Sequence, residues 1–264
     1  MLSDQATRFL AVALLASMAV ALVILLEADR RHMGVSYAQL PIYMFNQFMT
    51  RVRWRARLDG KVNLPPQQGA VIVCNHIGPV DPAFIAMACD RPVHWMVARE
   101  YCQVPLIGLA LRILEVIPTG RSGIDTAATK LAIRYAQQGE LVGMFPEGKL
   151  NDTGRLLLPG RAGAAMVALK ARVPIIPCYI EGSPFGGQVF LFFFLSAKTR
   201  LKVGSPIDIS EFYGQDGDRE VLKTLTRRLM HEIAALAGRP DYEPELAGRE
   251  WKESNNLAQA ANQV

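Results

Sequence analysis

From residue 70 onward the sequence alternates between short apolar stretches and helix-like stretches, and this alternation constrains the fold more than any other feature. The predicted strands are residues 70–74, 93–97, 116–118, 141–145 and 174–180. The predicted helices are residues 82–89, 105–114, 126–138, 161–172 and 218–237. Such alternation is typical of an α/β domain, so we predict a largely parallel mixed sheet flanked by helices. In such sheets functional residues gather at the carboxyl ends of strands.

A further apolar stretch, residues 189–195, contains four phenylalanines, Phe190, Phe192, Phe193 and Phe194. We predict that it is a buried strand; a loop that dips into lipid is the alternative.

The N-terminal region carries an uncharged apolar run, residues 9–26, in which the one polar side chain is Ser17. A helix of this length is just sufficient to cross the hydrocarbon core of a bilayer. A cleaved signal peptide is the alternative, but its apolar region is usually about 7 to 15 residues long. We therefore predict an N-terminal transmembrane anchor within residues 1–35.

Basic residues lie mostly on the C-terminal side of this run. Arg30 and Arg31 follow it, whereas Arg8 stands before it, so the positive-inside rule places the rest of the chain on the cytoplasmic face, at the inner membrane if the source is bacterial. Residues 36–57 then mix aromatic and aliphatic side chains with arginines, which is typical of an amphipathic segment in a membrane interface. A helix packed on the domain is the alternative.

Composition and missing motifs narrow the possible functions. The net charge of +5 fits an anionic membrane, a phosphorylated substrate or a nucleic acid. No RNA- or DNA-binding signature is present, so we predict no nucleic-acid partner. The four cysteines are scattered without metal-ligand spacing, so we predict no metal site and reduced thiols in the cytosol. G-x-S-x-G, P-loop, G-x-G-x-x-G and H-E-x-x-H motifs are also missing, which argues against the corresponding hydrolases, nucleotidases, dehydrogenases and metalloproteases.

Polar residues follow the first predicted strand, where Pro79 and Pro82 favour a turn between His76 and Asp81. A histidine paired with a carboxylate is suited to deprotonating a hydroxyl, because the carboxylate orients the ring and stabilises the imidazolium that forms. A surface turn with a solvated aspartate and an incidental histidine is the alternative.

Two further strand ends carry charged residues. Arg121 follows residues 116–118 and suits a phosphate, which a guanidinium can grip with two donors. Pro146 should end the strand at Phe145 and leave Glu147 at its carboxyl end, with Gly148 allowing close backbone approach. These residues could share one cleft with His76; a solvated arginine and a capping glutamate are the alternatives.

Four blocks in this order resemble the glycerolipid acyltransferase family, of the 1-acylglycerol-3-phosphate or lysophospholipid acyltransferase type. The blocks are Asn75-His76-x4-Asp81, the segment from Arg99-Glu100 to Ile117-Pro118-Thr119-Gly120-Arg121, Phe145-Pro146-Glu147-Gly148, and Val173-Pro174-Ile175-Ile176-Pro177. The resemblance covers residues 58–209. It implies an enzyme that transfers an acyl chain from a coenzyme A or acyl carrier protein thioester, with no cofactor, metal or covalent enzyme intermediate.

The resemblance also implies roles for individual residues. His76 is the general base on the acceptor hydroxyl, and Asp81 is its partner. The implied substrate-binding residues are Asn75, Arg99, Arg121, Phe145, Pro146, Glu147, Gly148 and Lys149. The implied organisation is a membrane anchor (residues 1–35), an interfacial helix (36–57), an acyltransferase α/β domain (58–238) and a polar tail (239–264), which we expect to be loosely held.

The third block departs from the family pattern, because Lys149-Leu150-Asn151 stands where the family usually has Thr-Arg-Ser. Lys149, Arg155 or Arg161 could supply the positive charge. The resemblance as a whole and the N-terminal apolar run still predict a membrane-bound acyltransferase that converts lysophosphatidic acid to phosphatidic acid. The alternatives are another lysolipid acceptor, such as a lyso-amino-lipid, and a non-catalytic lipid-binding protein on the same fold.

Overall fold

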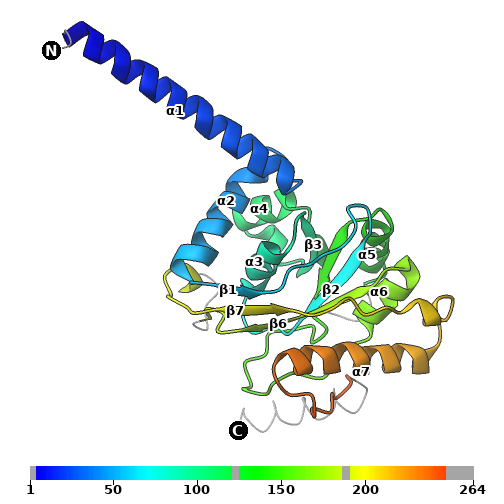
Figure 1. The fold of residues 1–264 in the computed structure, drawn as a ribbon. Coiled ribbons are helices and arrows are strands. Elements are labelled where there is room, and N and C mark those ends of the chain that lie inside the picture. Colours follow the sequence, from blue (N-terminus) through cyan, green and yellow to red (C-terminus); the bar gives the residue numbers. More distant parts are fainter. Residues whose placement is uncertain (1–3, 121–124, 186–190, 248–264) are drawn as a thin grey trace.

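The computed structural model describes residues 4–120, 125–185 and 191–247. Its sheet has seven strands in the order β1-β7-β6-β2-β5-β3-β4 (Figure 1). The strands are β1 (Arg57–Asp59), β2 (Ala70–Cys74), β3 (Val93–Ala98), β4 (Ile117–Thr119), β5 (Leu141–Met144), β6 (Ile175–Glu181) and β7 (Arg200–Val203). All neighbouring strands are parallel except β6 and β7, which confirms the predicted mixed α/β fold.

Helices cover both faces of this sheet, and α1 precedes it. The longer helices are α1 (Asp4–His32), α2 (Leu40–Phe48), α3 (Asp81–Ile85), α4 (Ile107–Ile113), α5 (Thr126–Gln137), α6 (Gly163–Ala171) and α7 (Arg219–Leu236). One-turn helices are η1 (Met49–Arg53, π-type) and the 3₁₀ helices η2 (Ala86–Ala88), η3 (Tyr101–Gln103), η4 (Leu191–Phe193) and η5 (Ser210–Phe212).

The central strand β2 is buried along its whole length because both of its faces are covered. Val71 and Val73 point into a core shared with α5, α6 and α7. Ile72 and Cys74 point to the other face, where the second core contains Trp54 and Phe84. Side chains that alternate between two cores fix the register of β2, because a slip of one residue would exchange the two faces. The strand end that carries His76 is therefore rigidly placed.

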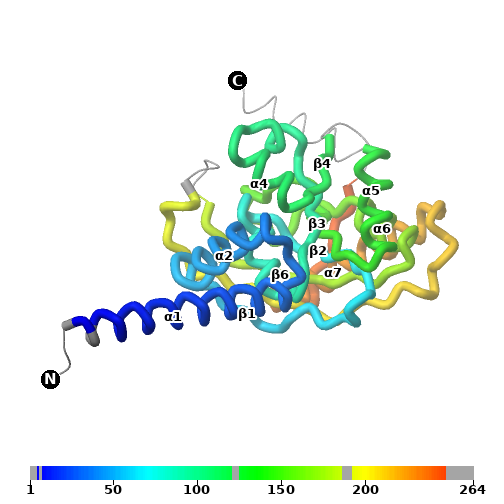
Figure 2. Tube along the Cα trace, turned by 90° about the horizontal axis from the view of Figure 1, so that it is seen from above, coloured from blue at the N-terminus to red at the C-terminus, as the bar shows by residue number. Residues whose placement is uncertain are grey.

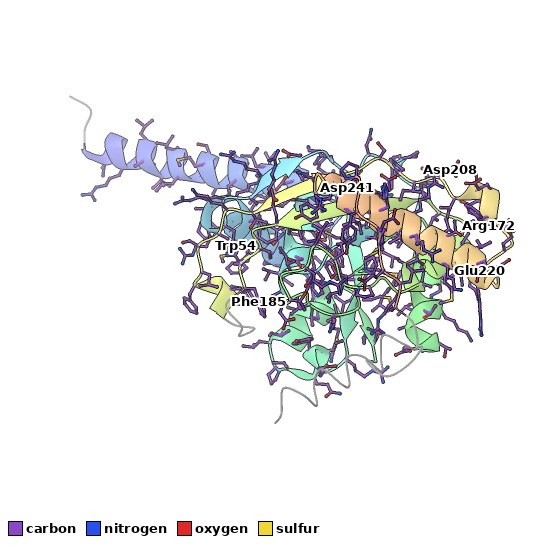
Figure 3. All side chains as sticks on the ribbon, turned by 90° about the horizontal axis from the view of Figure 1, so that it is seen from below. Trp54, Arg172, Phe185, Asp208, Glu220 and Asp241 are labelled. Carbon is purple, nitrogen blue, oxygen red and sulfur yellow. The ribbon has the colours of Figure 1, made fainter. Side chains whose placement is uncertain are left out.

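Helix α1 projects away from the body of the protein (Figures 1 and 2). Residues 8–32 form the one helix in the described part of the chain that is long and apolar enough to cross a membrane, and none of its apolar window is buried. At its C-terminal end Glu27 accepts hydrogen bonds from Arg30 and Arg31. Trp54 lies on the side of the body from which α1 leaves, and Arg172 lies at the opposite end (Figure 3).

The structure corrects the prediction for residues 189–195. In its described part this stretch forms the 3₁₀ helix η4 rather than a strand. Phe192 is buried against Trp54, whereas Phe194 is 76% exposed. Neighbouring phenylalanines thus have opposite surroundings, which a strand buried on both faces would not allow.

Two further differences concern the ends of the domain. Strand β1, which was not predicted, begins inside the segment 36–57 and pairs with β7. The first part of the expected loose tail is tied back to the body. The amide of Gly160 donates to the carbonyl of Glu245 at 2.8 Å, and the amide of Ala247 donates to the carbonyl of Gly160 at 2.8 Å. Residues 248–264 lie outside the described residues.

Candidate active site

The loop after β2 brings His76 and Asp81 together. His76 Nδ1 lies 3.0 Å from Asp81 Oδ2. The same oxygen accepts hydrogen bonds from the amides of Ile77 (2.8 Å) and Gly78 (2.9 Å). Asp81 is fully buried at the start of α3, and the His76 side chain is 18% exposed. With Nδ1 directed at the carboxylate, Nε2 is the ring atom that can accept a proton from a ligand.

An aromatic stack fixes the plane of the His76 ring. The imidazole lies parallel to the ring of Phe145, with centroids 3.8 Å apart and an interplanar angle of 8°. Phe145 in turn stacks on Trp95 at 4.9 Å. Gly143 of β5 makes room for the indole, because a β-carbon there would lie 2.5 Å from the Trp95 ring. The stack thus joins the loop after β2, the residue that follows β5, and strand β3 itself.

Glu147 supports His76 through the backbone. Its Oε1 accepts a hydrogen bond from the His76 amide at 2.8 Å, and its Oε2 accepts one from the Leu158 amide at 2.8 Å. The residue is buried, and this burial raises the pKa of its carboxyl to about 7, although the two amide donors favour the charged form. Both carboxylate oxygens are therefore engaged with the protein.

Asn151, which the sequence analysis did not single out as a site residue, holds the other side of the His76 backbone. Its backbone amide donates to the His76 carbonyl at 2.7 Å. Its side chain bonds the Arg155 carbonyl and accepts from Thr153. An asparagine two residues before a threonine in a polar stretch is a turn pattern that could have identified it. Residues 147–151 thus clamp His76 between a carboxylate and an amide.

The other residues of the 145–149 turn have distinct surroundings. Gly148 adopts a left-handed backbone conformation (φ +69°), and its amide donates to the Phe145 carbonyl at 3.0 Å, which closes the turn. Pro146 is buried, and its carbonyl accepts from the Arg161 amide at 2.9 Å. The Lys149 side chain is exposed beside this turn.

Lys149, Arg155 and Arg161 were each predicted as a possible positive charge for the third block, and their surroundings in the structure differ. The Arg161 side chain lies across Gly148, where an added β-carbon would be 3.0 Å from Arg161 Nε. Arg155 forms an ion pair with Glu245 of the returning tail. Lys149 and Arg161 are thus the two of these three that lie directly at the turn.

Asn75 and Arg99 are held by the protein itself. The Asn75 side chain is buried and pairs with the backbone of Ile180, donating to its carbonyl at 2.9 Å and accepting from its amide at 2.8 Å. It therefore ties the end of β2 to β6. The Arg99 side chain donates to Asp125 at 3.2 Å.

Asp125 was missed by the sequence analysis. It accepts from the Gly120 amide at 2.9 Å and caps α5 by accepting from the Ala128 amide at 3.0 Å. An aspartate directly before a helical stretch is the pattern that could have identified this cap. Arg121 lies outside the described residues, but Asp125 fixes the backbone at Gly120 just before it.

The first three of the four blocks lie at or beyond the carboxyl ends of strands in a largely parallel α/β sheet, and the fourth spans the start of β6. A family model described as acyltransferase matches residues 55–181, which span β1 to β6. The 1-acyl-sn-glycerol-3-phosphate acyltransferase of Bacillus subtilis is 27% identical over 191 residues, covering 72% of this chain and 92% of that protein. The protein of the same name from Borreliella burgdorferi is 28% identical over 122 residues, covering 46% of this chain and 48% of that protein.

Among solved structures, the 1-acyl-sn-glycerophosphate (LPA) acyltransferase PlsC from Thermotoga maritima has a similar fold. The TM-score is 0.58 at 22% identity, and the match covers 75% of this chain and 80% of that chain. The chain thus belongs to the glycerolipid acyltransferase family, and it is an O-acyltransferase.

Proposed function

We propose that the protein transfers a fatty acyl chain from an acyl-CoA or acyl carrier protein thioester to the free hydroxyl of a lysophospholipid, with lysophosphatidic acid as the acceptor. The observation that carries the proposal is the His76–Asp81 pair. The buried carboxylate holds Nδ1 while the Phe145 ring holds the plane of the imidazole, so Nε2 keeps one direction. The names of the similar acyltransferases support the same acceptor.

In the proposed reaction His76 acts as a general base. Nε2 takes the proton of the acceptor hydroxyl as the hydroxyl oxygen attacks the thioester carbonyl carbon, and Asp81 stabilises the imidazolium that forms. The tetrahedral intermediate then collapses with cleavage of the carbon–sulfur bond, and the imidazolium returns the proton to the departing thiolate. The products are the ester and the free thiol, and His76 is again neutral.

The acceptor phosphate would be met by cations beside the third block. Lys149 and Arg161 lie at the Gly148 turn, which follows β5, the strand that also leads into Phe145. Arginine can grip a phosphate with two donors, whereas lysine offers a compact point charge. Because this block departs from the family pattern, another lysolipid such as a lyso-amino-lipid is the second candidate acceptor.

We further propose that the protein works at the cytoplasmic face of a membrane, anchored by α1. The α2 residues Phe45 and Phe48 are more than half exposed. The Phe45 ring packs beside that of Phe193 in η4, with the ring centroids 6.0 Å apart. Arg53 donates to the Phe194 carbonyl and so ties the exposed phenylalanine to η1. We call Phe45, Phe48, Phe193 and Phe194 the aromatic surface. Such side chains suit the interfacial layer of a leaflet, where nearby arginines each add about 1 kcal/mol with anionic lipid.

Product analysis tests the function directly. Purified full-length protein in lipid vesicles would be offered lysophosphatidic acid, other lysophospholipids and a lyso-amino-lipid, each with acyl-CoA and with acyl carrier protein thioester. Mass spectrometry should show phosphatidic acid as the main product, with release of one thiol per ester formed. Exclusive acylation of another lysolipid would refute the acceptor, and lysolipid binding without thiol release would refute catalysis.

A further inference from the structure

Two buried oxygens beside the His76–Asp81 pair lack hydrogen-bond partners within the described part of the chain. Asp81 Oδ2 accepts three hydrogen bonds, whereas Asp81 Oδ1 is buried and accepts none. The hydroxyl oxygen of Ser183 is also buried and unpartnered. A buried polar atom without a partner is costly, and more so on a carboxylate. A hydrogen bond to each of these oxygens would therefore stabilise the folded protein.

The two oxygens face the same point in space. A β-carbon built on Gly78 would lie 2.5 Å from Ser183 Oγ and 3.2 Å from Asp81 Oδ1. The missing side chain of Gly78 thus leaves room between a hydroxyl and a carboxylate. A serine hydroxyl can donate one hydrogen bond, and a carboxylate oxygen accepts, so the chemistry of the two groups is complementary.

The chain after β6 is shaped to put Ser183 at this point. Gly182 has a left-handed backbone conformation (φ +69°), and a β-carbon on it would lie 2.5 Å from the Lys198 carbonyl oxygen. Glycine is therefore required for the turn that follows Glu181, the last residue of β6. Because β6 is paired with β2, this turn comes beside the loop that carries His76.

We propose that Ser183 is a positioning residue whose hydroxyl rotates to donate a hydrogen bond to Asp81 Oδ1. With this bond both carboxylate oxygens are held, Oδ2 by His76 and two amides and Oδ1 by Ser183. Asp81 then cannot turn away from Nδ1, and His76 keeps Nε2 toward the acceptor. This role rests on the proposed general-base function of His76, since it acts only through the orientation of that ring.

Steady-state kinetics of the full-length enzyme test the role. Ser183→Ala should lower kcat about tenfold, the worth of a hydrogen bond to a charged group, and leave the KM for the lysolipid unchanged. Ser183→Thr keeps a hydroxyl at the same carbon and should retain a kcat within about twofold of wild type. Wild-type kcat in Ser183→Ala, or an equal loss in Ser183→Thr, would overturn the proposal.

Two double variants test whether a hydroxyl placed at position 78 can replace that of Ser183. Gly78→Ser combined with Ser183→Ala should recover kcat, because the new β-carbon would lie 3.2 Å from Asp81 Oδ1 and can carry a hydroxyl toward it. Gly78→Ala combined with Ser183→Ala is the matched control and should stay slow. Equal rates in the two double variants, each shown to be folded by its thermal unfolding curve, would refute the role. Turnover of the wild-type enzyme in the same assay reports separately on the proposed function.

Discussion

Replacing Glu147 with glutamine should change how the stability of the fold depends on pH. Burial raises the pKa of this carboxyl from 4.5 to about 7. Between these values the folded chain keeps a proton that the unfolded chain has released, so the free energy of unfolding must fall as pH rises. The raised pKa corresponds to a contribution of about 3 kcal/mol to the free energy of unfolding. This contribution is present while the carboxyl is protonated and is lost once the pH exceeds about 7.

Urea unfolding of the full-length protein in detergent, followed by tryptophan fluorescence at several pH values from about 5 to 8, measures this effect. The difference in unfolding free energy between wild type and Glu147→Gln should shift by about 2.5 kcal/mol against the wild type across that range, because part of the effect is already lost between pH 4.5 and about 5. The comparison with the glutamine variant removes the contribution of every other ionisable group, because those groups are present in both proteins. A difference that stays constant with pH would show that the two amide donors keep Glu147 ionised throughout, and would refute the reasoning.

Two further predictions concern the anchoring of the site and of the body. Asn75→Ala should lower the unfolding free energy by about 3 kcal/mol, because it leaves the buried amide and carbonyl of Ile180 unpaired. Asn63→Ala, at an exposed position, is the control. An equal effect of both substitutions would contradict the role of Asn75 in tying β2 to β6. In vesicles, Phe194→Trp should add fluorescence that brominated lipids quench, whereas Tyr213→Trp, in the segment between β7 and α7, should not; equal quenching of both would count against the aromatic surface.

The central strands and the helices between them could be predicted from sequence because their apolar runs are bounded by glycine and proline. Strand β2 was predicted with its observed bounds. Strand β1 was not, because its three residues have only partial burial, which gives no apolar run. The segment around Phe192 misled the prediction, since burial of one phenylalanine by Trp54 and exposure of the next depend on tertiary packing.

The composition of the site was easier to predict than its internal contacts. The turn between His76 and Asp81 follows from the local positions of the prolines. The bond from Glu147 to the His76 amide joins residues 71 positions apart, and the bond that joins Asn75 to Ile180 spans 105. Such pairings depend on which strands lie side by side, and local patterns carry no information about that order.

The rate of acyl transfer by His76→Ala, compared with His231→Ala, tests the central claim most directly. His231 lies in α7, where its Nε2 is within 2.8 Å of the Pro240 carbonyl, so it serves as a histidine control remote in sequence from the site. Removing a general base typically costs about 10²- to 10⁴-fold in rate. We predict a loss of this size for His76→Ala with an unchanged thermal unfolding curve, and near wild-type transfer for His231→Ala. Wild-type transfer by a folded His76→Ala variant would contradict the account.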